Sequence, residues 1–156
     1  MFKKFFILII LIFILTGCSE EKPILTVNIE GIERVIDAET IYSNQEAITF
    51  PAVVRSSGEK PLETEYKGIE FSKLLKTLDI DISNFSKVTF NATDGYRIIL
   101  GVEELNEPSN VYLSFERDGN LLKSKKQGGN GPFQLIIRRD PFSQRWIKHV
   151  DEIILQ

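Results

Sequence analysis

The chain offers few side chains for covalent or metal chemistry. It has 156 residues, among them one cysteine, Cys18, and one histidine, His149. One cysteine closes no intramolecular disulfide and forms no Cys-X-X-Cys pair, and with one histidine it supplies too few ligands for zinc. No carboxylate or nucleophile stands at an informative spacing from His149, so we expect an ordinary surface or core-edge histidine on a terminal strand. Any chemistry therefore depends on oxygen and nitrogen groups.

Basic side chains gather near the C-terminus and are the strongest sign of a ligand site. Arg138, Arg139, Arg145 and Lys148 fall within one short segment. Together with Arg55 they would line a pocket for an anion, because guanidinium and ammonium groups donate charge-assisted hydrogen bonds to oxyanions. The alternative is a solvated hairpin whose cations are neutralised by carboxylates in the same segment. The sequence leaves both interpretations open.

Two glycine-containing motifs also allow two interpretations each. Asp94-Gly95-Tyr96 would present a carboxylate and a phenol at the rim of a pocket, or would form a common turn followed by an amphipathic aromatic residue. Residues 128–131, Gly-Gly-Asn-Gly, would cradle a phosphate through backbone N–H groups or would form a mobile loop. No lysine-serine pair and no helix start follows the second motif, so it is not a P-loop.

The overall charge excludes one class of partner. Nineteen lysines and arginines stand against 22 aspartates and glutamates, which gives a net charge of −3. Nucleic-acid binding requires a clustered excess of cations, so we expect no nucleic acid partner. The content of 42% hydrophobic and 26% charged residues is that of one ordinary globular domain.

The N-terminus is typical of an exported protein. Two lysines precede an unbroken apolar run from Phe5 to Leu15, which is too short to span about 30 Å of hydrocarbon as a helix. The run ends in Leu-Thr-Gly-Cys, which resembles the lipobox of bacterial lipoproteins. The resemblance implies a signal peptide over residues 1–17, a diacylglyceryl thioether on Cys18 and a tether over 18–23. The alternative is a cytosolic protein with an apolar N-terminal helix and an ordinary buried cysteine.

Residues 24–156 must position any site, and their pattern predicts a single α+β domain. The apolar residues Phe71, Leu74, Leu75 and Leu78 recur at helical spacing and predict the main helix. We expect a mixed, partly barrel-like β-sheet with this helix and a few short helices. A proline at position 51 argues for an edge strand or a bulge there. The predicted strands cover residues 24–29, 47–54, 88–92, 98–100, 111–115, 133–137 and 146–155.

Three stretches in order resemble the molybdopterin-binding domain of the sulfite oxidase family in its short bacterial form. They are residues 66–75, residues 88–96, which end in Asp-Gly-Tyr, and residues 131–137 continued by 146–150. The resemblance covers about residues 47–156 and implies a mixed α+β fold. It also implies a site where two dithiolene sulfurs of a pterin and one protein cysteine hold the metal.

The chain departs from the family at two positions that the resemblance assigns to the cofactor. The loop after residues 49–54 reads Val-Val-Arg-Ser-Ser over residues 53–57 and has no cysteine, and a serine hydroxyl is a poor replacement for a soft thiolate. Gln134 stands where the family carries an arginine for the anionic groups of the pterin. We therefore expect no cofactor and a degenerate pocket, for which the candidate residues are Arg55, Ser56, Asp94, Tyr96 and Lys148.

The function expected from these observations is that of a membrane-anchored, extracytoplasmic accessory protein without catalysis. Its pocket would hold a small anionic ligand or contact an envelope protein partner. A first alternative is an oxidoreductase that binds molybdopterin and uses a metal site without cysteine. A second alternative is an envelope scaffold with no ligand in the pocket.

Overall fold

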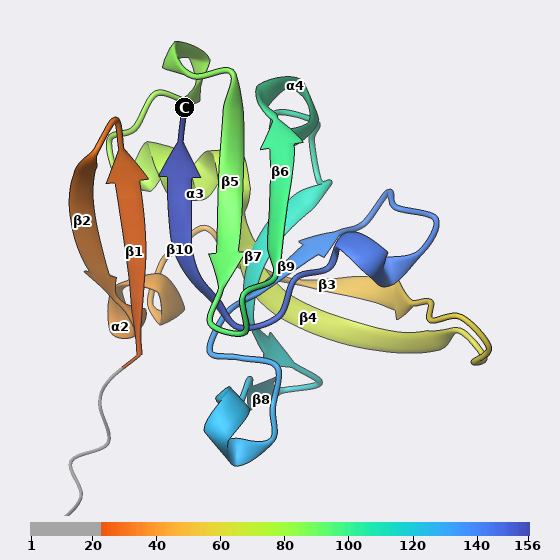
Figure 1. Ribbon diagram of the computed structural model, residues 1–156. Coiled ribbons are helices and arrows are strands. Elements are labelled where there is room, and N and C mark those ends of the chain that lie inside the picture. Colours follow the sequence, from red (N-terminus) through yellow and green to blue (C-terminus); the bar gives the residue numbers. More distant parts are fainter. Residues whose placement is uncertain (1–22) are drawn as a thin grey trace, which may run out of the picture.

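Two five-stranded sheets form the frame of the protein. The computed structural model describes residues 23–156 (Figure 1), so the predicted signal peptide and Cys18 lie outside the described residues. The first sheet is mixed, because β1 runs parallel to β10 while the other neighbours are antiparallel. Its strands in spatial order are β2 (Ile32–Asp37), β1 (Ile24–Ile29), β10 (Val150–Leu155), β5 (Lys87–Ala92) and β6 (Arg97–Gly101).

The second sheet is antiparallel and carries the site described below. Its strands are β3 (Ala47–Val54), β4 (Leu62–Glu70), β7 (Val111–Arg117) and β8 (Asn120–Leu121), and β9 (Gln134–Ile137) also pairs with β7. Pro51 lies in β3, which is at the edge of this sheet and pairs with β4. An edge strand tolerates proline because its residues do not all have to donate a backbone hydrogen bond to a neighbouring strand. The two sheets do not close into a barrel, so the partly barrel-like expectation is not met.

Few of residues 23–156 are helical, as the sequence predicts. The α-helices are α2 (Ala38–Tyr42), α3 (Phe71–Thr77) and α4 (Val102–Leu105), and the 3₁₀ turns are η1 (Ile82–Asn84), η2 (Lys125–Gln127) and η3 (Ser143–Arg145). Within residues 23–156, no helix combines the length and apolar character needed to cross a bilayer.

The predicted main helix is confirmed as α3, and its apolar stripe faces the core. Phe71, Leu74 and Leu75 are buried, and Leu78, just past the helix, is partly buried against the same cluster. The ring of Phe71 meets the ring of Phe90 from β5 edge to face, with centroids 4.9 Å apart. Through Phe71 the helix packs against β5 of the first sheet, and it also contacts β4 and β7 of the second sheet.

Leu75→Ala should destabilise the fold by about 2–5 kcal/mol, because it empties a closely packed buried site. Chemical denaturation measures this loss in the free energy of unfolding. Lys76→Ala on the exposed side of the same helix is the control and should change stability by less than about 0.5 kcal/mol. A Leu75→Ala loss as small as that of the control would contradict the assigned face.

The last predicted strand begins later than the sequence indicates. Residues 146–149 are not in a strand, and β10 starts at Val150. The backbone of His149 has a φ of 56°, in the left-handed region, which a continuous strand does not allow. The apolar residues Trp146 and Ile147 are buried but do not belong to a strand. Their hydrophobicity therefore made the predicted strand four residues too long at its start.

Candidate functional site

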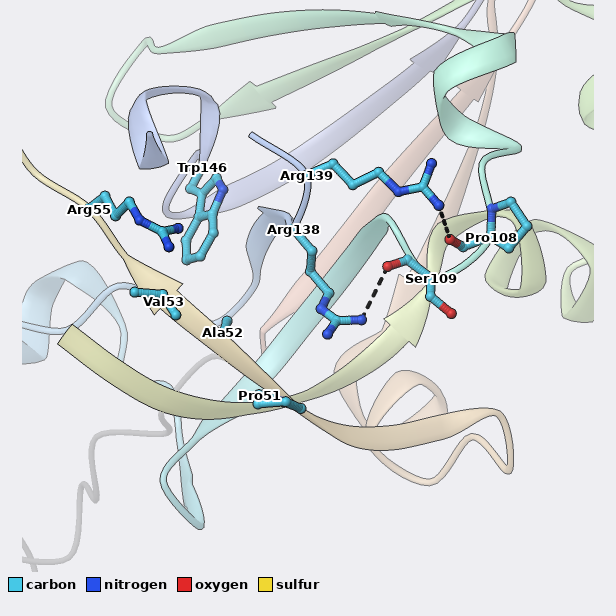
Figure 2. Close-up of a pocket in the computed structure, with 9 residues that line it drawn as sticks. All are labelled: Pro51, Ala52, Val53, Arg55, Pro108, Ser109, Arg138, Arg139 and Trp146. Carbon is cyan, nitrogen blue, oxygen red and sulfur yellow. Dashed lines mark hydrogen bonds between the residues drawn. The ribbon is translucent and has the colours of Figure 1, made fainter. Parts of the chain in front are cut away.

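A groove opens between the end of β3 and the segment that follows β9 (Figure 2). Its volume is about 540 Å³. Pro51, Ala52, Val53 and Arg55 line it from β3 and its end, Pro108 and Ser109 from the turn before β7, and Arg138, Arg139 and Trp146 from the segment beyond β9. Three arginines from two distant parts of the sequence thus meet at one groove.

Arg138 and Arg139 reach the groove from consecutive positions and are held by the turn before β7. The Arg138 guanidinium lies over the Phe50 ring, 5.6 Å from its centroid, and its Nη1 donates to the Ser109 carbonyl at 3.3 Å. Nη1 of Arg139 donates to Oε2 of Glu107 at 2.8 Å, and Nη2 donates to the Pro108 carbonyl at 3.1 Å. Figure 2 shows both guanidinium groups directed toward this turn.

A buried asparagine fixes the backbone that carries these arginines. The carbonyl of Asn110 accepts from the backbone N–H of Arg138 at 2.9 Å, and its Oδ1 accepts from that of Arg139 at 3.1 Å. Its Nδ2 donates to Oε2 of Glu107 at 3.0 Å, so one side chain links the turn, the arginine segment and the carboxylate. Sequence reasoning missed Asn110, because a single asparagine before an apolar strand gives no signal of such a role.

Arg55 comes from the other side of the groove, at the end of β3. Its backbone N–H donates to Oγ of Ser143 at 2.9 Å, and its carbonyl accepts from the N–H of Ser143 at 3.1 Å. These two bonds join the end of β3 to η3. Trp146, just beyond η3, is buried beneath the groove, and its indole Nε1 donates to the Ile137 carbonyl at 2.8 Å.

Arg145 stabilises the segment between Arg139 and Trp146 by binding two carboxylates. Its Nε donates to Oδ2 of Asp140 at 2.9 Å, its Nη2 also bonds Asp140, and its guanidinium spans both oxygens of Glu104 at 2.7 and 3.2 Å. These hydrogen bonds, first those with Asp140 and then those with Glu104, raise the pKa of Arg145 above its ordinary value. Arg145 is thus committed to structure and is not free for a ligand.

Arg145→Leu should lower the free energy of unfolding by about 1–3 kcal/mol, because it leaves the carboxylate of Asp140, which is only 9% exposed, without its partner. The Arg145 side chain is 42% exposed, which keeps the effect below that of a fully buried pair. The control is Arg139→Leu, whose pair with Glu107 is exposed on both sides. It should cost at most about 1 kcal/mol. Equal losses in thermal or denaturant unfolding would contradict the structural role of Arg145.

The structure separates the candidate residues that the sequence grouped. Arg55 lines the groove, whereas Ser56, Asp94, Tyr96 and Lys148 are not among its lining residues. Ser56 lies exposed in the turn that follows β3, and Lys148 is exposed ahead of β10. Arg138 and Arg139, which the sequence assigned to the cationic cluster, take the places at the groove instead.

The Asp94-Gly95-Tyr96 motif forms a turn beyond β5. Oδ1 of Asp94 accepts from the backbone N–H of Tyr96 at 3.1 Å, and Gly95 has a φ of 85°, which only glycine adopts readily. The Tyr96 hydroxyl donates to the Gln144 carbonyl at 3.3 Å, so this residue braces η3 from outside the groove. Burial, aided by the charges of Glu152 and Asp94, raises the pKa of Asp151 nearby.

His149 is a buried structural residue. Its Nδ1 lies 3.0 Å from the Gly131 carbonyl, and its backbone N–H donates to the Asn130 carbonyl at 2.9 Å. No described contact joins the imidazole to a carboxylate or to the groove. The histidine therefore joins the Gly-rich loop to the start of β10.

The charge balance determines what the groove attracts. Among residues 23–156, Arg139 forms an ion pair with Glu107, whereas no salt bridge includes Arg55 or Arg138. Two guanidinium groups therefore face the groove without a carboxylate to neutralise them. Such an arrangement favours a ligand with oxyanion groups.

The residues at this position do not fit a molybdenum centre of the family's type. The segment after β3 presents the Arg55 guanidinium to the groove and the Ser56 hydroxyl to solvent, and residues 19–156 contain no cysteine. Within the described residues, no three side chains of His, Cys, Asp or Glu gather in a metal-binding group. A soft metal that requires a thiolate finds cations and a hard hydroxyl here.

Gln134, where the resemblance expects an arginine for the pterin, lies away from the groove. It is buried in β9 opposite Ser114 of β7, and its Oε1 and the Ser114 Oγ have no hydrogen-bond partner among the described residues. Gln134 therefore points into the sheet interior rather than toward the groove lining.

Comparison with known proteins supports the fold and no more than the fold. No protein-family model and no curated protein matches the chain. Among solved structures it is similar to the sulfane dehydrogenase SoxCD from Paracoccus pantotrophus, with a TM-score of 0.67 and 16% sequence identity over 89% of this chain. The match spans only 40% of the SoxCD chain. The protein thus shares a sulfite oxidase-like fold with part of SoxCD, as its three sequence stretches implied.

Proposed function

We propose that this protein is a lipid-anchored, extracytoplasmic accessory protein that binds an anionic ligand in the arginine groove and performs no redox chemistry. The observation that carries the proposal is the pair of guanidinium groups, Arg55 and Arg138, that face one groove without a carboxylate partner in the described part of the chain. The fold supplies the frame, and the arginines supply a different chemistry from that of a metal centre.

The groove suits a ligand that combines oxyanion and planar or apolar parts. Arg55 and Arg138 approach from opposite walls, β3 and the segment beyond β9, so one anion can be contacted from two sides. Proline and aliphatic side chains of β3 and the turn before β7 line the rest, over the buried indole of Trp146. Phosphate esters, sulfate esters and free carboxylates share the oxyanion chemistry that meets these requirements.

The absence of a thiol in residues 19–156 supports a role in binding rather than catalysis. Serine at position 56 would need a strongly lowered pKa to act as a metal ligand, and its hydroxyl lies exposed in a turn. The position of the groove and the identity of its side chains favour retention of a ligand by charge and hydrogen bonds.

The lipid anchor is part of the same proposal and rests on the N-terminal sequence. An apolar run that ends in Leu-Thr-Gly-Cys, with the only cysteine of the chain at its last position, supports lipidation of Cys18. The anchored protein would act at the extracytoplasmic face of the cell membrane, with a small anion or an envelope protein as partner.

Thermal unfolding in sodium phosphate, sodium sulfate and sodium chloride at equal ionic strength tests the binding proposal. We expect phosphate or sulfate to raise the Tm in a saturable manner, since a ligand that binds only the folded state stabilises it by mass action. Chloride at the same ionic strength controls for screening. A Tm that is the same in all three salts, together with no bound oxyanion in native mass spectra, would contradict the proposal.

A further inference from the structure

Three exposed lysines lie in the loop between β8 and β9, and no ion pair among residues 23–156 includes them. They are Lys123, Lys125 and Lys126. Leu121, just before the loop, is 54% exposed. Unpaired lysines beside an exposed apolar side chain are the kind of surface that meets anionic lipid headgroups.

The loop holds these lysines in a defined place. Ser124 and Gln127 form a capping box around η2, the N–H of Gly129 donates to the Ser124 carbonyl at 3.0 Å, and that of Gly131 donates to the Lys123 carbonyl at 2.8 Å. A side chain at Gly129 or Gly131 would collide with the backbone of Lys123 or Leu122. The glycines that the sequence assigned to a phosphate cradle or a mobile loop are therefore used for close packing beneath the lysines.

The loop lies at the same end of the molecule as the start of the described chain. The Pro23 carbonyl accepts from the N–H of Ala38, which places α2 beside the start of β1. Tyr42 at the end of α2 contacts Phe115, with ring centroids 5.1 Å apart, and the Phe115 carbonyl accepts from the N–H of Leu122. Figure 1 shows the start of β1 and the loop after β8 in the lower part of the molecule, opposite the C-terminus.

The proposed anchor brings this end to the bilayer. Four residues lie between Cys18 and Pro23, and the five Cα–Cα steps that join them reach about 18 Å at most in an extended chain. Residues 18–156 carry 17 lysines and arginines against 22 aspartates and glutamates, a net charge of −5, so an anionic surface repels most of the anchored protein and attracts the lysine loop. The short tether and the charge pattern therefore act together on orientation.

We propose that the loop bearing Lys123, Lys125 and Lys126 is the surface by which the anchored protein contacts anionic phospholipid headgroups. The inference rests on the proposed lipidation of Cys18 and adds to it an oriented contact. Lys87 provides an internal reference, because β5 starts beside the end of β10, at the end of the sheet away from the start of β1.

The test uses the full lipidated protein reconstituted into vesicles of phosphatidylglycerol or of phosphatidylcholine alone, with amine-reactive labelling read by mass spectrometry. In phosphatidylglycerol at low salt, we expect labelling of Lys123, Lys125 and Lys126 to slow at least about fivefold, while Lys87 labels equally in both vesicles. High salt should remove the protection, since charges that are exposed to solvent are screened.

A matched pair of double variants distinguishes an effect of the loop lysines from an effect of total protein charge. In Lys125→Gln/Lys126→Gln, the protection of Lys123 should fall to its value in phosphatidylcholine, whereas Lys60→Gln/Lys87→Gln should leave it unchanged. Equal labelling of the loop in both vesicles, in protein that still floats with the vesicles in high salt, would overturn the contact and leave the anchor standing. Protein that does not float would overturn the anchor and the contact together.

Discussion

The double variant Arg55→Gln/Arg138→Gln is expected to weaken binding of phosphate or sulfate by at least about 100-fold. Hydrogen bonds to a charged group contribute about 1.5–3 kcal/mol each, and this variant removes one guanidinium from each wall of the groove. Isothermal titration calorimetry of the purified protein measures the change. Each single variant should lose about tenfold or more, because either arginine alone still contacts the anion from one side.

The same double variant should fold almost as well as the unaltered protein. Both side chains are exposed, and neither belongs to an ion pair of the described residues. The stacking of Arg138 over Phe50 is the main interaction lost, and at an exposed site it contributes about 0.5–1 kcal/mol. A loss of binding without a loss of fold is therefore the expected signature of a ligand site.

Arg34→Gln/Arg97→Gln is the charge-matched control. Both of these arginines lie on the first sheet, in β2 and β6, and neither lines the groove. The control removes the same total charge and should keep anion affinity within about twofold, since neither side chain lines the groove and exposed charges that do not contact the anion are weakened by salt screening. Equal loss of affinity in both double variants would show that net charge, not the groove, attracts the anion.

Cys18→Ala is expected to abolish lipid anchoring. The variant lacks the only thiol that can carry a diacylglyceryl group, and each buried methylene of such a group contributes about 0.8 kcal/mol to membrane binding. The protein should then be released from the membrane or accumulate as a precursor that retains residues 1–17. Cell fractionation with gel mobility and intact mass distinguishes these two results.

Ser19→Ala is the control for the Cys18 experiment, because it alters the adjacent residue and leaves the thiol intact. It should fractionate and migrate like the unaltered protein. A Cys18→Ala protein that is found in the membrane fraction at the mature mass would refute lipidation of this cysteine.

The sequence predicted most of the strands and the main helix, because their side chains alternate or recur with a clear period. Phe71, Leu74 and Leu75 form the buried face of α3, and Val88 and Phe90 of β5 are buried as expected. In contrast, β2 was not predicted, since five of its six residues are exposed and Ile36 alone reaches the core. An edge strand of this kind has no hydrophobic pattern to detect.

β4 was missed for a related reason. Its inward positions include Thr64, Tyr66 and Gly68, so polar or small residues occupy places where an apolar alternation is normally sought. Gly68 lies against the backbone of β7, where an added Cβ would be 2.5 Å from the Leu113 carbonyl oxygen. Close backbone approach is a tertiary property that sequence periodicity does not contain.

The sequence predicted the cationic character of the site better than it predicted which residues line it. The sequence placed Arg55 with Arg138 and Arg139 in one cationic set, and the structure brings all three to the groove. The predicted set also included Lys148 and Arg145, and neither lines the groove. Arg145 binds two carboxylates, and Lys148 lies exposed before β10. Which cations remain unpaired depends on contacts between residues more than thirty positions apart, such as Arg145 with Glu104.

The most direct test of the central claim is metal analysis combined with native mass spectrometry of the lipoprotein purified from its own host. We expect no stoichiometric molybdenum or pterin, and we expect a bound oxyanion or other anionic ligand that is lost from Arg55→Gln/Arg138→Gln. One molybdenum per chain, together with oxidation or reduction of a sulfur or nitrogen oxyanion that disappears in Ser56→Ala or Ser57→Ala, would contradict the account and identify an oxidoreductase with a non-cysteine metal site.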